Sequence, residues 1–300
     1  MKKARQNSIN AANHRLGYAF LLPGMFFITL FVLIPICYSM YMSLYEWTLF
    51  DLGREKVFMA FKNYSRVFLD SSFGNAVKNT LSIVIISVVI EMILGFLIAL
   101  GLWSVKRSLK AVHTIILLPM ITAPVVVSLI WRYIYDPQFG ILNFVLRKTI
   151  GMPANAWLAD ARLALPSIMV AEIWQMTSFV ILVLYAGLTV VPIDGLEAAL
   201  IDGASYWQIV RHIIIPYILP LSFLVMMIRT MDIMRIFDMV YVLTRGGPAS
   251  STETLSIYIH KAGFQNFEMG YAMALSFITL VGILIISLGY VVAMNRRGEV

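Results

Sequence analysis

Six long apolar stretches constrain the fold of this 300-residue chain more than any other feature. A helix that crosses the hydrocarbon core of a bilayer needs about 20 mostly apolar residues. The stretches that meet this requirement are residues 18–41, 81–102, 111–134, 165–191, 216–240 and 271–294. Hydrophobic residues make up 60% of the chain and charged residues only 13%, far from the balance of a soluble domain. The sequence therefore predicts an all-α membrane protein with six transmembrane helices.

Basic residues beside the spans predict the orientation of the chain. They gather in the polar lead (residues 1–17), in the short connection between the second and third spans, and in the tail (residues 295–300). The segments on the opposite side hold about as many lysines and arginines, but these segments are longer, so the density is lower there. Short loops and the first helix carry most weight in the positive-inside rule. We therefore expect a multi-pass protein of the cytoplasmic membrane with both termini in the cytoplasm.

The composition excludes several other classes of protein. A single cysteine, Cys37, excludes an intrachain disulfide framework, and the net charge of +7 suits anchoring against anionic lipid better than nucleic-acid binding. No glycine is followed by lysine, so the phosphate-binding motif G-x-x-x-x-G-K-[ST] is absent. The histidines are scattered and form no metal-binding spacing: His14, His113, His212 and His260. We expect a chain that is not an enzyme and that holds no cofactor or metal of its own.

The connection between the fourth and fifth spans, residues 192–215, reads as short helices at a membrane surface. Good helix formers fill residues 196–201, and Glu197 lies near the helix start, where a carboxylate suits the dipole. Gly203 permits a sharp bend or a close approach of another backbone. Small side chains at Ala198, Ala199 and Ala204 leave room for a second protein. From these residues alone, an ordinary interfacial loop is the alternative interpretation.

This connection resembles the EAA loop of the permease subunits of binding-protein-dependent ABC importers. The residues that match the family pattern position by position are Glu197, Ala198, Ala199, Asp202, Gly203, Ala204, Ile213 and Pro216. Ile215 departs from the pattern, because the family more often has leucine there, but the two side chains have the same volume. The long, gapped pattern identifies the importer permease class and does not identify the substrate.

Shorter motifs along nearly the whole chain resemble the carbohydrate-uptake branch of this class, the MalF/UgpA-like permeases. The matching segments are Asn79–Thr80, Pro119, Leu129–Arg132, Gly140–Asn143, Phe237–Asp238, Val242–Pro248 and Thr252. The larger maltose-type members carry extra N-terminal spans and a big outer domain. This chain shows neither, so it resembles the shorter six-span members with the type I ABC importer permease fold.

The resemblance implies that different subunits carry out transport and ATP hydrolysis. In the family, the EAA loop is a coupling helix that docks on a cytoplasmic ATPase, which assigns ATPase coupling here to Glu197, Ala198, Ala199, Asp202, Gly203 and Ala204. ATP and Mg²⁺ are then bound by that ATPase and not by this chain. The implied partners are a second permease of similar fold, two ATPase subunits and an extracytoplasmic solute-binding protein in a bacterial inner membrane, with no nucleic acid.

Ionisable side chains inside the fifth span are costly in a membrane and therefore mark function or pairing. Arg229, Asp232, Arg235 and Asp238 recur every three residues with alternating charge, so neighbours can pair along the helix. They form either a neutralised ladder against the partner permease or, at Asp232 and Arg235, part of an aqueous path. Arg132 lies near a span end, where its side chain can snorkel, and the sequence assigns it no role.

The fourth span contributes a second polar group made of Glu172, Trp174 and Gln175. A carboxylate, an indole and an amide are the side chains that a sugar site uses, although a buried hydrogen-bonded cluster would contain the same types. Glu91 in the second span has no evident partner, and helix packing is its simpler interpretation. The substrate-path candidates are Glu172, Trp174, Gln175, Asp232 and Arg235.

These features predict a subunit that forms the translocation path for a mono- or oligosaccharide, by alternating access driven by ATPase subunits. A permease for glycerol-3-phosphate or another polyol-type solute is one alternative. An ion-coupled secondary carrier, with Glu91 or Glu172 as the coupling carboxylate, is another; it would carry an inverted repeat, which is not evident by eye. An intramembrane enzyme is the third alternative, and it lacks any nucleophile–base or metal spacing.

Overall fold

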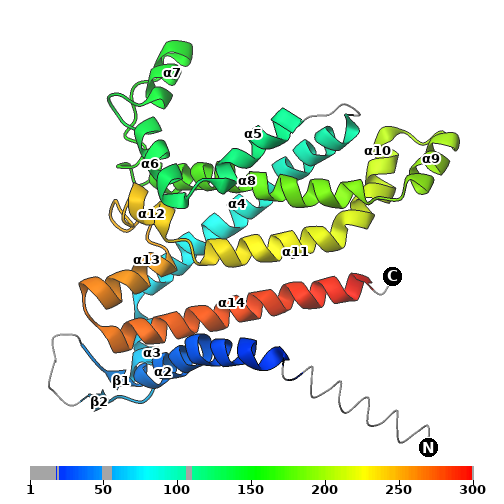
Figure 1. Cartoon of the computed structure of the whole chain (residues 1–300). Helices are drawn as coiled ribbons and strands as arrows, with labels where there is room; N and C mark the ends of the chain where they lie inside the picture. Colours follow the sequence, from blue (N-terminus) through cyan, green and yellow to red (C-terminus); the bar gives the residue numbers. More distant parts are fainter. Residues whose placement is uncertain (1–17, 19, 49–55, 106–109, 299–300) are drawn as a thin grey trace, which may run out of the picture. The chain divides into compact units, whose positions relative to one another are not determined.

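The computed structural model describes residues 18, 20–48, 56–105 and 110–298 (Figure 1). Within these residues, five helices are long and apolar enough to cross a membrane: Phe20–Met42, Ser71–Ser104, Ala164–Thr189, Tyr206–Met234 and Met269–Met294. A bent pair of helices, Ala111–Ile121 and Pro124–Ile134, makes a sixth span if the pair is counted as one. The lead (residues 1–17) and residues 299–300 of the tail lie outside the described residues. The chain divides into two compact units, Met1–Leu69 with Lys261–Ile278 and Asp70–His260 with Thr279–Val300.

The first unit joins an apolar helix to a small hairpin. Its elements are η1 (Thr29–Leu33), α2 (Ile34–Met42), β1 (Tyr45–Glu46), β2 (Val57–Phe58), α3 (Lys62–Leu69), η3 (Lys261–Gln265) and the start of α14 (Met269–Gly298). The strands are antiparallel, with Tyr45 opposite Phe58. The Asn63 amide donates to the backbone oxygens of Ser43 and Tyr45 at 2.8 and 3.0 Å, which ties α3 to the hairpin.

The second unit is a helical bundle. Its elements are α4 (Ser71–Ser104), α5 (Lys110–Ile121), α6 (Pro124–Ile134), α7 (Ile141–Ile150), α8 (Ala164–Thr189), α9 (Ile193–Ile201), α10 (Tyr206–Ile209), η2 (Val210–Ile214), α11 (Ile215–Met234), α12 (Asp238–Leu243), α13 (Leu255–His260) and the rest of α14. α4 packs along α8, and α11 packs on both of them. α9 and α10 lie at one end of α8 and α11, whereas α7 and α12 lie at the other end (Figure 1).

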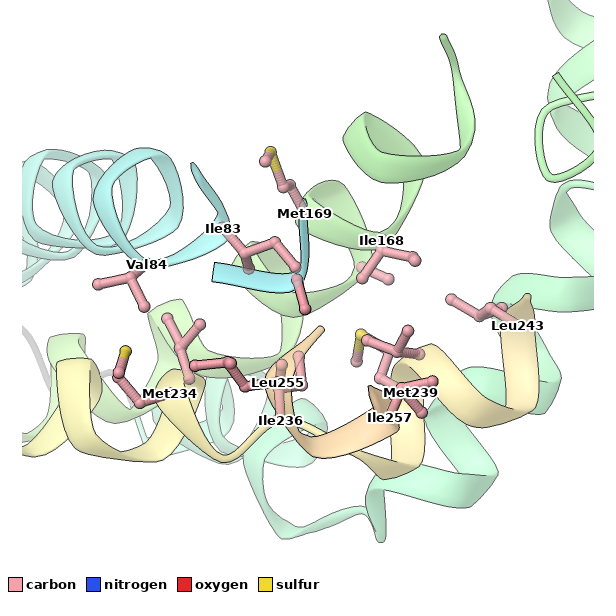
Figure 2. Packing of buried hydrophobic residues seen from close by; sticks show 14 of the residues in the cluster. Ile83, Val84, Ile168, Met169, Met234, Ile236, Met239, Leu243, Leu255 and Ile257 are labelled. Atoms are coloured by element: carbon pink, nitrogen blue, oxygen red, sulfur yellow. The ribbon is translucent and has the colours of Figure 1, made fainter. Parts of the chain in front are cut away.

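Two apolar clusters hold this bundle together. The cluster nearer α12 contains side chains from α4, α8, α11, α12 and α13, among them Ile83, Ile168, Ile233, Met239 and Ile257; Figure 2 shows most of them converging. The cluster nearer α9 joins α8 to α10 and η2, through residues such as Leu184, Leu188, Val210 and Ile214. Helices α4, α8 and α11 each contribute side chains to both clusters, so these three helices form the core of the unit.

Helix α4 begins at Ser71, well before the expected start of the second span near residue 81. Asp70 is the reason, because its carboxylate accepts a hydrogen bond from the Ser72 backbone at 2.8 Å and so caps the helix. A helix of 34 residues rises roughly 50 Å at ~1.5 Å per residue, which exceeds a hydrocarbon core of about 30 Å. The helix is therefore longer than one crossing requires, and its first turns carry polar side chains such as Asn75 and Asn79.

The expected third span, residues 111–134, is not one straight helix. α5 ends at Ile121 and α6 begins at Pro124, with a bend of 95° between them. Pro124 lacks a backbone N–H and disfavours helical geometry at the residue before it, and Ala123 is accordingly extended, with φ −58° and ψ 136°. Pro119 also lies inside α5, but α5 continues past it to Ile121, so the break in the span belongs to Pro124.

The fifth apolar helix ends at Met234 and not near Val240, as the apolar pattern suggested. The chain turns at Arg235, whose backbone N–H bonds to the Asp232 carbonyl at 3.1 Å, and a separate short helix, α12, starts at Asp238. The charge ladder proposed for Arg229, Asp232, Arg235 and Asp238 is therefore wrong at its last member. Asp238 lies beyond the helix end, where spacing by three no longer makes it a neighbour of Arg235 along one helix.

Candidate functional site

The loop between α8 and α11 ends its first helix in a tightly bonded turn. At the end of α9, Gly203 adopts a left-handed φ of 78°, which costs glycine little. The Gly203 N–H donates to the Leu200 carbonyl at 3.1 Å, and the Ala204 N–H donates to the Ala199 carbonyl at 2.9 Å. These two bonds define a Schellman motif. The bend expected at Gly203 is therefore present and has one well-determined geometry.

Helix α10 starts immediately after this turn with its own cap. The Ser205 backbone N–H donates to Oε1 of Gln208 at 2.7 Å, and the Ser205 hydroxyl donates to the same oxygen at 2.8 Å. The Gln208 backbone N–H bonds in turn to the Ser205 side chain, which completes a capping box. With both helix ends bonded in this way, α9 and α10 form a stiff angular element between two spans.

This element carries large apolar side chains that none of the described residues covers. Ile201 is 86% exposed and Trp207 is 67% exposed, and Ile193 and Leu200 are also exposed. Beside them lies a recess of about 340 Å³, lined by residues that include Asp202, Gly203 and His212. Exposed large apolar side chains of this kind are typical of a protein–protein contact.

The residues assigned to ATPase coupling divide between the two sides of the loop. Glu197, Ala198, Asp202 and Gly203 are exposed. Ala199 and Ala204 are half-buried and pack against the apolar cluster near α9. Four of these residues can therefore contact another protein, whereas the two packed alanines hold the loop against the ends of α8 and η2.

A buried ionic cluster lies at the centre of the second unit. The Arg229 side chain on α11 donates from Nε to Oε2 of Glu91 on α4 at 2.9 Å, and from Nη2 to Oε1 of Glu172 on α8 at 2.5 Å. All three residues are buried. One guanidinium therefore joins three helices, which meets the requirement that ionised groups in a membrane be paired.

The edge of this cluster is exposed. Asp232 accepts from Nη1 of Arg229 at 3.4 Å and from Nη2 of Arg235 at 3.2 Å. The side chains of Asp232 and Arg235 are 46% and 66% exposed within this single chain. Charged side chains of transmembrane helices rarely face lipid. This face of α11 is therefore one that water or another protein contacts.

The three polar or aromatic candidates on α8 differ in exposure. Trp174 is 45% exposed and meets the Trp131 ring from α6 edge to face, with centroids 5.9 Å apart. Glu172 and Gln175 are instead buried. Sequence reasoning did not select Trp131 as a candidate, although its motif Leu129–Arg132 was noted. The pairing of Glu91 was also missed, because Arg229 lies 138 residues away along the chain.

Gln175 supports the break in the third span. Its Nε2 donates to the Thr122 carbonyl at 3.0 Å, an oxygen close to the junction of α5 and α6. The backbone N–H of Val126, which would reach that carbonyl in a continuous helix, bonds to the Ala123 carbonyl instead. A broken helix at membrane depth needs such a substitute donor.

Replacing Gln175 with leucine is expected to lower the free energy of unfolding by about 1 kcal/mol, because the Thr122 carbonyl loses its donor. The measurement is unfolding by SDS of the purified protein in mixed micelles. Gln138→Leu, which alters an exposed glutamine, is the control and is expected to leave stability unchanged. Equal stability of the two variants would remove this role from Gln175.

Comparison with known proteins places these features in one family. The family model described as "Binding-protein-dependent transport system inner membrane component" matches residues 91–297. The trehalose/maltose transport system permease protein MalF of Thermococcus litoralis is 32% identical over 277 residues, which cover 92% of each chain. A chain in the crystal structure of a bacterial ABC transporter that imports the acidic polysaccharide alginate has a TM-score of 0.81 and 25% identity, and the match covers 96% of this chain and 97% of that one.

A second alginate transporter structure, in complex with an alginate-bound periplasmic protein, has a TM-score of 0.80 at 25% identity and covers 94% of both chains. The apolar helices, the bent loop and these matches together define a permease subunit of an ABC importer. The chain belongs to the family of binding-protein-dependent transport system inner membrane components, in its carbohydrate-uptake branch.

Proposed function

We propose that this chain forms part of the translocation path for a sugar that an extracytoplasmic binding protein delivers. The similar MalF protein belongs to a trehalose/maltose system, and the similar alginate transporter binds a periplasmic protein loaded with alginate pentasaccharide. Their sugars differ in charge but share hydroxyl groups and pyranose rings. Sugar import is therefore the function that accounts for both relatives, and it is preferred here over import of glycerol-3-phosphate or another polyol.

The observation that carries the proposal is the stiff α9–α10 element with its exposed apolar face. In our proposal, a cytoplasmic ATPase subunit covers this face, with Glu197 in an ion pair and Ile201 and Trp207 in apolar contact. ATP and Mg²⁺ bind to that ATPase. Because both helix ends are capped, the element moves as a unit, and closure of two ATPase subunits is transmitted to α8 and α11.

The path itself is proposed to run along the exposed side of α8, α6 and α11. Trp174 and Trp131 present aromatic surface on which a sugar ring can stack, and Asp232 with Arg235 provides acceptors and donors for hydroxyl groups. Glu172 acts through Arg229, whose position it helps to set. A second permease of similar fold covers the remaining part of this face.

The orientation follows from the coupling element. A contact with an ATPase requires the α9–α10 end of the bundle to be cytoplasmic. The α7–α12 end of the same unit is then extracytoplasmic and meets the binding protein (Figure 1). Six crossings would return the C-terminus to the side of the N-terminus, so both termini are proposed to be in the cytoplasm and the chain in the inner membrane.

The test is uptake by proteoliposomes that contain this chain, its second permease and both ATPase subunits. We expect radiolabelled sugar to enter only with ATP inside and the cognate binding protein outside. The binding protein is also expected to stimulate ATP hydrolysis. Uptake that follows an imposed proton or sodium gradient without ATP would instead indicate a secondary carrier and would contradict the proposal.

The role of Asp232 in the path predicts a defined kinetic change. Asp232→Asn removes the charge but keeps the size, and we expect the KM for uptake to rise about tenfold, as for the loss of one hydrogen bond to a charged group. ATP hydrolysis stimulated by the binding protein should remain. Asp160→Asn, at an exposed carboxylate in another segment, is the control. Failure of the Asp232 variant to assemble would indicate a purely structural pair.

A further inference from the structure

Helix α3 is bonded directly to the end of the first membrane-spanning helix. The Tyr64 hydroxyl lies 2.7 Å from the Ser43 hydroxyl, and the Asn63 amide donates to the Ser43 carbonyl at 2.8 Å. Ser43 follows Met42, the residue at which α2 and the first span end. α3 therefore lies at the membrane surface where the first span ends, which is the extracytoplasmic surface in the proposed orientation.

The same helix packs along the first turns of the last span. The Phe277 ring on α14 meets the Tyr64 ring edge to face, with centroids 6.5 Å apart, and the guanidinium carbon of Arg66 lies 4.2 Å from the centre of the Tyr271 ring. Phe277 lies eight positions after Met269, where the apolar helix starts, and eight positions correspond to a rise of about 12 Å. α3 is therefore beside the apolar part of α14 and not beyond its end.

The face of α3 that points away from these contacts is apolar. Phe61, which directly precedes the helix, is 70% exposed, and Leu69 at its end is 87% exposed. Phe68 lies about two turns after Phe61 on the same side and is also exposed, as is Phe58 on the preceding strand β2. Ser65 lies between the two phenylalanines of the helix face, and its hydroxyl donates to the Phe61 carbonyl at 3.3 Å, so it needs no partner outside the chain. An exposed apolar face of this kind marks contact with a membrane or with another protein.

Lysines border this apolar face. Lys62 directly follows Phe61 and is exposed. Lys56, also exposed, precedes β2, and its ammonium lies 4.8 Å from the centre of the Trp47 ring; tryptophan is enriched where proteins meet the membrane interface. Lysine is depleted in protein–protein interfaces, whereas phenylalanine and leucine on one face with lysines beside them are typical of helices that lie in the membrane interface. The composition of this face therefore favours lipid over a protein partner.

We propose that residues 56–69 form an interfacial anchor that binds phospholipid beside the first and last spans. Phe61, Phe68 and Leu69 enter the upper part of the acyl region, which removes their apolar surface from water. Lys56 and Lys62 meet the lipid phosphates through charge-assisted hydrogen bonds. Because α3 contacts both the end of α2 and the start of α14, the anchor holds these two span ends at one depth in the bilayer. The lipid contact requires only the membrane fold, whereas its assignment to the extracytoplasmic leaflet rests on the proposed function.

The experiment measures the depth of spin labels in the full importer, reconstituted in nanodiscs of phosphatidylethanolamine and phosphatidylglycerol. Cys37→Ser removes the single native cysteine of this chain, and the variants Phe61→Cys, Ser65→Cys and Lys62→Cys are each labelled with a nitroxide before assembly. Depth follows from the ratio of collisions with oxygen, which concentrates in the acyl region, and with a water-soluble nickel chelate. We expect the labels at positions 61 and 65 about 5–10 Å below the phosphates and the label at position 62 at the level of the phosphates. Gln138→Cys, at an exposed position before α7, is the control and should collide mainly with the nickel chelate.

Two results would overturn the inference. Labels at positions 61 and 65 that collide mainly with the nickel chelate would place this face in water. Labels that collide with neither reagent would place it under another subunit or another part of the chain. Ser65→Cys changes one atom, so it keeps the test valid if Phe61→Cys does not assemble. Neither result would alter ATP-driven uptake, whereas loss of that uptake in the unaltered importer would refute the proposed function and leave the label depths unchanged.

Discussion

Replacement of Arg229 with methionine is expected to remove most of the folded permease from the membrane. Arg229 is the only guanidinium that contacts both Glu91 and Glu172 within the described residues, and both carboxyl groups are buried. Breaking a buried ion pair by removing one partner costs about 3–5 kcal/mol, because the remaining charge stays unpaired. The measurement is the free energy of unfolding by SDS, with the yield of monodisperse protein after extraction as a second readout.

Two further variants separate charge from packing at this cluster. Glu91→Gln leaves the Arg229–Glu172 pair intact, so we expect a smaller loss than for Arg229→Met. The triple variant Arg229→Met, Glu91→Gln and Glu172→Gln carries no charge among these three positions and should recover much of the stability, since neutral replacement of a whole buried pair is often tolerated. If Arg229→Met unfolded at the same SDS concentration as the unaltered protein, the cluster would contribute nothing measurable.

Replacement of Gly203 with aspartate is expected to abolish ATP-driven uptake while the permease stays folded. A Cβ atom at this position would meet no other atom within 4 Å, so the cost of a side chain here comes from the left-handed φ and not from a clash at Cβ. The aspartate side chain would project into the space where we propose that the ATPase docks, beside Asp202. The expected result is loss of ATP hydrolysis stimulated by the binding protein, measured on the reconstituted complex, together with weaker co-purification of the ATPase subunits.

Gly203→Asn is the matched control for this prediction. Asparagine and aspartate are similar in size, and both tolerate the left-handed φ of 78° better than other non-glycine residues. Any difference between the two variants therefore measures the added negative charge at the docking face, whereas a shared defect measures backbone strain and side-chain bulk. Full activity of both variants would contradict ATPase docking at this turn.

The bent loop shows how well local sequence signals can specify a functional element. Gly203 was expected to bend the chain because a left-handed turn favours glycine, and residues 196–201 were expected to be helical because they are good helix formers. Both features are present, in α9 and in the turn after it. The split between exposed Asp202 and half-buried Ala204 could not be predicted, because it depends on which side of the loop packs against α8 and η2.

The fifth span shows where local signals were insufficient. Apolar residues continue past Met234, so hydropathy placed the helix end near residue 240 and put Asp238 on the same helix as Asp232. The helix ends at Met234, and no proline or glycine near that point marks the end in the sequence. The packing of Ile236 and Met239 into the apolar cluster near α12 accompanies the turn, and such long-range packing is not visible in a local pattern.

The sequence by itself determined the membrane class, the approximate positions of the spans, the helical loop with its bend, and the family. These depend on hydropathy, residue size and motif spacing, which act over a few residues at a time. Only the tertiary structure decided that Glu91 and Glu172 share Arg229, that Gln175 serves the broken third span, and that Tyr64 on α3 contacts Phe277 on α14. Those partners lie on different helices, and hydrogen bonds and ion pairs form between atoms a few ångströms apart in space regardless of their separation along the chain.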